Sequence, residues 1–248
     1  SAASDVYKRQ GCTFPSIPNV PDHPDLRTGA VYGTGKREEN LRGYFAAISA
    51  MDEQIGRLLD AVEEQGLADN TVILFTADNG MSMGQHGVWG KGNGTFPMNM
   101  YDSAVKVPFL ISWPGHIPAN TVCSEMISAC DLLPTILELT GLSDRQPAGL
   151  PGRSFTELLK GEQREHRDEV VIFDEYGPVR MIRTKEWKYV HRYPYGKHEL
   201  YHLVDDPGEE KNLYGLPEYK KLVTELKGRM EKWFCTYSDP AIDGVRSA

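Results

Sequence analysis

The sequence is poor in the features that mark several broad classes of protein. It has only four cysteines, at positions 12, 123, 130 and 235, and no Cys-x-x-Cys pair. A structural zinc site and a disulfide-rich scaffold are therefore not expected. Basic residues are outnumbered, with 27 Lys and Arg against 35 Asp and Glu, and the net charge is −8. This balance argues against a nucleic-acid binder, which needs basic surface to neutralise phosphates.

Long apolar runs are also absent, since none approaches the roughly 18–20 residues of a membrane span. The 248 residues, 40% hydrophobic and 25% charged, are typical of a globular protein of one large domain or one and a half. The string Asp5-Val-Tyr-Lys-Arg-Gln10 resembles a translated sequencing adapter, so we expect residues 1–10 not to be natural protein and the chain to be a fragment. We expect two domains after it, residues 11–161 and 162–248.

Hydrophobic periodicity predicts the main elements of the first domain. Apolar residues at three- and four-residue steps indicate a helix over 40–65. Residues 71–76 and 107–112 are continuous apolar runs, typical of strands buried on both faces of a parallel sheet. Asp131 is predicted to cap a helix whose first turn contains Pro134. Alternating helices and buried strands indicate an α/β layer structure.

The pattern changes after about residue 162. Residues 169–176, 179–184 and 186–193 are predicted to be strands joined by short turns, which is typical of an antiparallel sheet. A final helix is expected over 217–234, with Leu222, Leu226, Met230 and Trp233 facing inward. These elements predict a small α+β subdomain.

The most informative polar residues directly follow the predicted strand 71–76. Asp78 and Asn79 lie where ligands bind in open α/β sheets, just beyond the carboxyl end of a strand. Their carboxylate and amide oxygens suit Ca²⁺ or Mg²⁺. Asp-Asn-Gly is also a common turn string, so a metal site and a polar turn both remain open.

Two further residues follow in a glycine-rich segment. Lys91 lies between Gly90 and Gly92, which would let an anion approach the backbone closely and meet the lysine charge. The alternative is a solvated surface lysine. His86, five residues earlier, could donate to an anion or a leaving-group oxygen, or be structural.

Four segments in this order resemble the type I sulfatases, the arylsulfatase-like branch of the alkaline phosphatase superfamily. They are Asn70-Thr-Val-Ile-Leu-Phe-Thr-Ala-Asp-Asn-Gly80, His86-Gly-Val-Trp-Gly-Lys91, Val107-Pro-Phe-Leu-Ile-Ser-Trp-Pro-Gly115 and Asp131-Leu-Leu-Pro-Thr135. Further segments that match the family are Arg180-Met-Ile-Arg-Thr184, Lys188-Tyr189, Glu199-Leu-Tyr201 and Asp205-Asp-Pro-Gly-Glu-Glu-Lys-Asn-Leu213, so the resemblance covers nearly all of residues 11–235. It implies an alkaline-phosphatase-like α/β sandwich with a mostly parallel central sheet, truncated at its N-terminus, plus a small C-terminal α+β subdomain with an antiparallel sheet.

The resemblance implies hydrolysis of a sulfate ester by a formylglycine, made from a Cys or Ser in a Cys/Ser-x-Pro-x-Arg motif. It makes Asp78 and Asn79 ligands of Ca²⁺, with Mg²⁺ the less favoured ion, and Lys91 a sulfate-contacting residue. His86 matches a histidine found in only some branches. No Cys/Ser-x-Pro-x-Arg string occurs in this chain. We therefore expect the nucleophile in a missing N-terminal half, and no activity from the chain as written.

The resemblance also implies partners and a location. These are a sulfated small molecule or glycan as substrate, a formylglycine-generating or anaerobic sulfatase-maturing enzyme, and a periplasmic or secreted address, lysosomal in a eukaryote. Two alternatives remain open. One is a phosphoric or phosphonic ester hydrolase of the same superfamily, and the other is a degenerate sulfatase that binds an anion or carbohydrate without catalysis.

Overall fold

The computed structural model describes residues 11–17, 19–28, 37–162, 165–174, 178–194, 196–241 and 243. The chain divides into two compact units, Ser1–Gly115 and His116–Ala248. The adapter-like residues 1–10 lie outside the described part, and the domain boundary expected after residue 161 stays a prediction. Within the described residues, no helix is long and apolar enough to cross a membrane.

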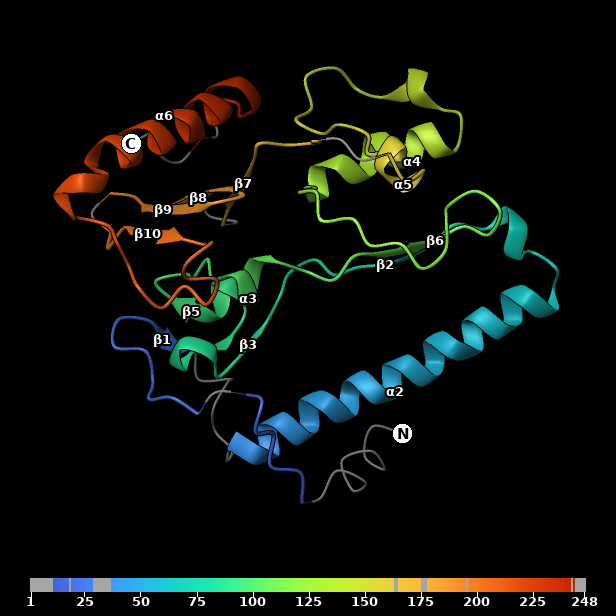
Figure 1. The fold of residues 1–248 in the computed structure, drawn as a ribbon, viewed down its shortest axis with the longest axis horizontal. Helices are drawn as coiled ribbons and strands as arrows, with labels where there is room; N and C mark the ends of the chain where they lie inside the picture. The colour runs from blue at the N-terminus through green and yellow to red at the C-terminus, as the bar shows by residue number, and fades with distance from the viewer. Residues whose placement is uncertain are drawn as a thin grey trace. The chain divides into compact units, whose positions relative to one another are not determined.

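The first unit contains one long helix, α2 (Arg37–Glu64), which confirms the helix predicted over 40–65 (Figure 1). It ends in a Schellman motif, because the Gly66 N–H donates to Glu63 O and the Leu67 N–H donates to Val62 O. Gly66 adopts the left-handed φ of 66° that this motif requires. Only two residues of the helix, Leu41 and Ala46, are buried. Much of the predicted apolar stripe is thus exposed, including Ile48, Met51, Leu58 and Leu59.

The strands β2 (Ile73–Phe75) and β6 (Leu110–Ser112) run side by side in Figure 1. They pair antiparallel, with Leu74 opposite Ile111, so the expectation that they are strands of a parallel sheet is wrong for this pair. They are not buried on both faces either, since Leu110 is 64% exposed. A run of apolar residues predicts a strand that other elements bury, but it does not indicate whether the strand pairs parallel or antiparallel. Within the described residues, no third strand joins the pair.

Two short strand pairs and one short helix complete the part of the first unit that carries the site. β3 (Ser82–Met83) and β4 (Trp89–Gly90) form an antiparallel hairpin, and β1 (Arg27–Thr28) pairs antiparallel with β5 (Thr95–Phe96). The short helix α3 spans Asp102–Val105. The buried apolar side chains around these elements are Leu26, Met83, Val88, Met100, Tyr101 and Ala104.

The second unit contains a four-stranded antiparallel sheet in the order β10-β9-β8-β7. Its strands are β7 (Glu169–Phe173), β8 (Val179–Thr184), β9 (Trp187–Arg192) and β10 (Glu199–His202). The sheet confirms the antiparallel pattern predicted for this region, with β8 at its predicted bounds and β10 as an additional strand. The mixed α/β class with an antiparallel C-terminal sheet is therefore confirmed.

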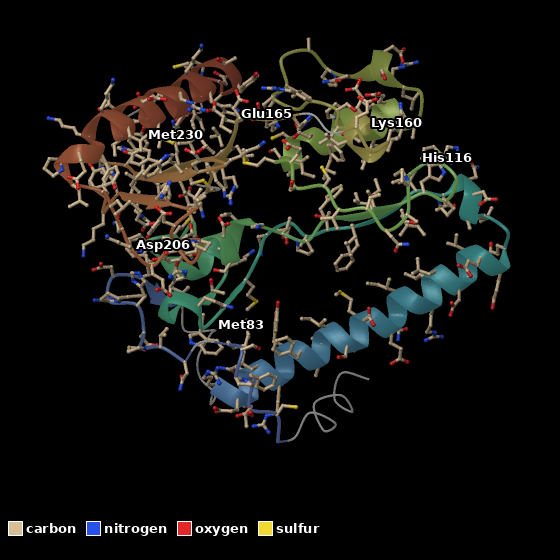
Figure 2. All side chains as sticks on the ribbon, viewed as in Figure 1. Met83, His116, Lys160, Glu165, Asp206 and Met230 are labelled. Atoms are coloured by element: carbon tan, nitrogen blue, oxygen red, sulfur yellow. The ribbon has the colours of Figure 1, made fainter. Side chains whose placement is uncertain are left out.

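The helix α6 (Lys220–Tyr237) covers one face of this sheet (Figure 1). Its buried residues Leu226, Met230 and Phe234 recur every four residues and so lie on one side of the helix. They share a core with sheet residues such as Ile182 and Leu200, and Met230 points from the helix toward the sheet in Figure 2. A 3₁₀ turn, Pro217–Tyr219, precedes α6, so the predicted start at 217 marks this turn.

Two short helices lie earlier in the second unit, α4 (Leu132–Leu139) and α5 (Thr156–Leu159). Asp131 lies at the predicted N-cap position of α4, but its side chain makes no cap hydrogen bond to this helix. Its fully buried carboxylate instead accepts hydrogen bonds from the Ser128 N–H, the Arg153 N–H and the Arg167 guanidinium. Burial raises the pKa of Asp131, but these hydrogen bonds outweigh it and hold the pKa below its ordinary value.

Candidate functional site

The hairpin formed by β3 and β4 brings two of the predicted site residues together. Asn79 lies three residues before Ser82, which opens β3, and Lys91 directly follows Gly90 of β4. Because Ser82 pairs with Gly90, the chain entering the hairpin and the chain leaving it lie side by side. The Lys91 Nζ donates a hydrogen bond to Asn79 Oδ1 at 3.3 Å. The predicted anion-binding lysine and one predicted metal ligand are thus in contact.

The turn at Asp78 and Asn79 is ordered by its own side chains. Asp78 Oδ1 accepts a hydrogen bond of 2.8 Å from the Asn79 N–H. Asn79 Nδ2 donates to the Gly80 carbonyl at 2.8 Å, which orients the amide so that its oxygen faces Lys91. The Asp78 side chain is exposed, whereas Asn79 and Lys91 are half-buried. A carboxylate and an amide oxygen are therefore presented next to one fixed positive charge.

Hydrogen bonds join helix α3 to the segment that follows Asp78 and Asn79. The Gly80 N–H donates to the Ala104 carbonyl at 2.8 Å, and the hydroxyl oxygens of Ser82 and Ser103 lie 2.7 Å apart. A Cβ on Gly80 would lie only 2.2 Å from the Ser103 carbonyl oxygen, so glycine alone fits there. The position of Asn79 therefore depends on the position of α3.

His86 lies at the opposite end of the hairpin, in the 3₁₀ turn Gln85–Gly87. Its backbone has a φ of 56°, an unusual left-handed conformation for a residue with a Cβ. Its ring stacks on Tyr101, with the ring centroids 3.7 Å apart and the planes 4° from parallel. Tyr101 in turn has its hydroxyl 3.1 Å from His23 Nε2. Tyr101 and His23 could not be predicted from the sequence, because no local spacing links them to His86.

The donor chemistry at Asp78 and Asn79 suits a hard divalent cation, which prefers carboxylate and amide oxygens. Ca²⁺ takes about 6–8 oxygen ligands, so these two residues would fill only part of its shell. Among the described residues, no group of three or more His, Cys, Asp or Glu could hold a metal ion. The oxygen donors of Asp78 and Asn79 therefore fit part of the ligand set that such a cation takes.

Comparison with known proteins decides the family. The sulfatase family model matches residues 14–142, and the model of the N-sulphoglucosamine sulphohydrolase C-terminal region matches residues 84–235. The N-acetylglucosamine-6-O-sulfatase of Bacteroides thetaiotaomicron is 31% identical over 219 residues, which cover 82% of this chain and 37% of the relative. The chain belongs to the sulfatase family. The choline-sulfatase of Rhizobium meliloti is 33% identical over 186 residues, 71% of this sulfatase chain and 34% of the relative.

Solved structures agree with this assignment. A structure in complex with its substrate D-glucosamine-2-N,6-O-disulfate matches at a TM-score of 0.73 and 30% identity, covering 84% of this chain and 43% of that one. A phosphonate monoester hydrolase of Agrobacterium radiobacter matches at a TM-score of 0.68 and 26% identity, covering 81% and 42%. The fold is thus the alkaline-phosphatase-like fold of the sulfatases. The chain spans about two fifths of the length of its curated relatives.

Proposed function

We propose that this sulfatase chain supplies one side of the active site of a sulfate ester hydrolase. Lys91 is the residue that contacts the sulfate group, and Asp78 and Asn79 are ligands of a Ca²⁺ ion. The observation that carries this proposal is the 3.3 Å hydrogen bond from Lys91 Nζ to Asn79 Oδ1, next to the Asp78 carboxylate. It supports a site at which an anion and a hard cation are held side by side.

The proposed residues have distinct tasks. Transfer of a sulfuryl group spreads negative charge over its equatorial oxygens, so charged groups fixed in advance stabilise the transition state. Asn79 holds the Lys91 ammonium in place through its amide oxygen, which lowers the reorganisation needed when the anion arrives. The divalent cation, when bound, supplies Lewis acidity and orients the sulfate. His86 is proposed as a donor to the anion or to the leaving-group oxygen.

The nucleophile of the proposed reaction is assigned to no residue of this chain. Neither a cysteine nor a serine of the chain lies in a Cys/Ser-x-Pro-x-Arg string. The formylglycine that the family resemblance implies is therefore proposed to lie outside these 248 residues. Its formation requires a maturation enzyme, the formylglycine-generating or the anaerobic type.

The substrate class we propose is a sulfated glycan. Support comes from the names of relatives, which include an N-acetylglucosamine-6-O-sulfatase and an ulvan-active sulfatase of Formosa agariphila that is 32% identical over 214 residues. We extend the proposal to a periplasmic or secreted location on the precedent of the family. A small sulfate ester is the competing substrate class, favoured by the choline-sulfatase and by an arylsulfatase of Clostridium perfringens that is 32% identical.

A second candidate function is hydrolysis of a phosphonic ester. The observation in its favour is the likeness to the solved phosphonate monoester hydrolase of Agrobacterium radiobacter. We rank it below sulfate ester hydrolysis, because the curated relatives that are about 30% identical over most of the chain are named sulfatases.

The test uses the complete open reading frame that encodes this chain, co-expressed with a maturation enzyme. Hydrolysis of 4-nitrophenyl sulfate, glucosamine-6-O-sulfate and a phenyl phosphonate ester is measured for the unaltered protein, Lys91→Ala and Asp78→Asn. Lys160→Ala, which alters an exposed lysine, is the matched control (Figure 2). We expect Lys91→Ala to lower kcat/KM for sulfate esters about 100-fold or more, as loss of one preorganised donor does, and Lys160→Ala to change nothing.

Each other outcome selects an alternative. Preference for the phosphonate ester would replace the proposal by the phosphonic ester hydrolase. Binding of sulfated sugar without turnover of any ester would indicate the non-catalytic sulfatase relative. Full activity of Lys91→Ala would remove Lys91 from the site.

A further inference from the structure

We propose that Tyr101, held in place by His23, is a positioning residue of the site, setting both the His86 ring and the turn that carries Asp78 and Asn79. This inference rests on the proposed function and adds two residues to it. It comes from contacts between segments far apart in the sequence: His23 lies before β1, His86 at the tip of the β3–β4 hairpin, and Tyr101 before α3.

The contact between Tyr101 and His86 fixes the orientation of the imidazole. The rings are nearly parallel at 3.7 Å, and Tyr101 is only 4% exposed, so this ring is a buried platform for the half-buried histidine. The left-handed backbone of His86 is a sparsely populated conformation that the surrounding structure must enforce. Stacking on a fixed ring is such an enforcing contact.

Tyr101 is itself fixed by His23, whose proton can be assigned from its partners. The backbone N–H groups of Asp25 and Leu26 both donate to His23 Nδ1, each at 3.0 Å. Nδ1 therefore carries no proton, and the ring is neutral with its proton on Nε2. The Nε2–H then donates to the Tyr101 hydroxyl oxygen at 3.1 Å. His23 thus acts toward Tyr101 as a hydrogen-bond donor of fixed direction.

The backbone around His23 is also locked to the tip of the hairpin. The His23 N–H donates to the Gly87 carbonyl at 3.1 Å. A Cβ on Gly87 would lie 2.0 Å from the Pro21 carbonyl oxygen, so the two backbones touch where only glycine fits. The same segment therefore holds the residue after His86 and the ring on which His86 stacks.

Two backbone hydrogen bonds connect Tyr101 to the turn at Asp78 and Asn79. The Tyr101 carbonyl accepts from the Ala104 N–H at 2.8 Å and so opens α3, and the Ala104 carbonyl accepts from Gly80, next to Asn79. A displacement of Tyr101 would therefore move both ends of the hairpin, with His86 at the tip and Asn79 at the base. This double connection makes Tyr101 a positioning residue for the whole site.

The test is an NMR titration of the protein encoded by the complete open reading frame, first with CaCl₂ and then with sodium sulfate, followed through the Asn79 side-chain amide. In the unaltered chain we expect the Asn79 signal to shift with both ions. Tyr101→Leu removes the ring platform and should weaken sulfate binding about 10-fold, the scale of one aromatic contact. Tyr101→Phe and His23→Ala each remove the hydrogen bond between the two side chains. Each should weaken sulfate binding about 3-fold.

Three controls separate positioning from a general loss of structure. The double variant with His23→Ala and Tyr101→Phe should bind sulfate as weakly as His23→Ala alone, because the hydrogen bond that Tyr101→Phe removes is already absent from His23→Ala. His23→Gln, whose amide can still donate to Tyr101, should restore binding. Tyr237→Leu makes the same exchange at a 41% exposed tyrosine and should leave binding unchanged.

The outcomes that overturn the inference are distinct from failure of the proposed function. Unchanged sulfate binding in Tyr101→Leu, or additive losses in the double variant, would overturn the positioning role alone. If Tyr101→Leu does not fold, Tyr101→Phe and His23→Ala decide the matter. No response of Asn79 to either ion in the unaltered chain would overturn the proposed function, and the inference with it.

Discussion

Lowering the pH should destabilise the second unit through His191, a residue of β9 that is only 7% exposed. Burial, and then the nearby charges of His198, Lys227 and Arg180, lower the pKa of His191 from 6.5 to about 3. The ring stacks on His198 at 4.0 Å, and its Nδ1 lies 2.6 Å from the Tyr189 hydroxyl. Burial raises the pKa of that hydroxyl, so Tyr189 stays protonated and donates to His191. The folded unit therefore keeps His191 neutral.

The sign and the magnitude follow from the difference in bound protons. Between pH 6.5 and about 3, the unfolded chain binds a proton at His191 that the folded chain does not. The free energy of unfolding therefore falls as the pH falls through this window. At pH 4.5, two units below the ordinary pKa, the loss is about 2.7 kcal/mol, at 1.36 kcal/mol per unit.

The assay is urea unfolding followed by tryptophan fluorescence at pH 7.5 and pH 4.5. His191→Gln removes the titrating ring and keeps an acceptor for the Tyr189 hydroxyl, and His116→Gln is the control because His116 is exposed (Figure 2). We expect the unaltered chain to lose about 2.7 kcal/mol more than His191→Gln between the two pH values. Carboxylates titrate in all three proteins and cancel in the comparison. Equal losses in the unaltered chain and His191→Gln would refute the reasoning.

Three further variants test other parts of the second unit by chemical denaturation. Met230→Ala should lower the free energy of unfolding by about 2–5 kcal/mol, because the fully buried side chain leaves a cavity between α6 and the sheet; a loss under about 1 kcal/mol would contradict this packing. Glu209→Gln removes the carboxylate charge beside the fully buried Lys188 ammonium and should cost about 3–5 kcal/mol, measured against the exposed control Glu210→Gln. Ser128→Ala removes the side-chain half of a capping box and should cost about 1 kcal/mol, whereas no loss would show that the Asp131 carboxylate alone suffices.

The elements that the sequence predicts well are those with strong local periodicity. The helix expected over 40–65 is found at Arg37–Glu64, and the strand expected over 179–184 is found at those bounds. The relative direction of β2 and β6 could not be predicted, because the same two apolar runs can pair either parallel or antiparallel. The strand β10 could not be predicted, since it is only four residues long and starts with the charged Glu199. In the structure, Glu199 forms an ion pair with Arg192 of the neighbouring strand β9.

The candidate site also contains residues that a local motif predicts and residues that only the fold brings together. The sequence singles out Asp78, Asn79 and Lys91 as candidates from one short motif, and the contact between Asn79 and Lys91 follows from one local hairpin. The contact of Tyr101 with His23 joins residues 78 positions apart, and no local pattern encodes such a pair. Isolated histidines and tyrosines carry no signal until the fold brings their segments together.

The charges of Asp78 and Lys91 predict that the two proposed ligands, Ca²⁺ and sulfate, bind cooperatively. Asp78 and Lys91 carry opposite charges, so together they attract neither a cation nor an anion by net charge. A divalent cation on Asp78 changes this local sum from zero to +2 and turns the site toward anions, even in a chain whose net charge is −8. We therefore expect saturating Ca²⁺ to tighten sulfate binding by about 5–150-fold, the usual range of coupling between two ligands, and sulfate to tighten Ca²⁺ binding equally.

The variant Asp78→Asn tests whether the Asp78 charge causes this coupling. Without Ca²⁺, it should bind sulfate more tightly than the unaltered protein, and it should gain little affinity when Ca²⁺ is added. Calorimetric titration of sulfate with and without Ca²⁺, on the protein encoded by the complete open reading frame, measures both effects. A sulfate affinity independent of Ca²⁺ in the unaltered protein would show that Asp78 does not couple the two ligands.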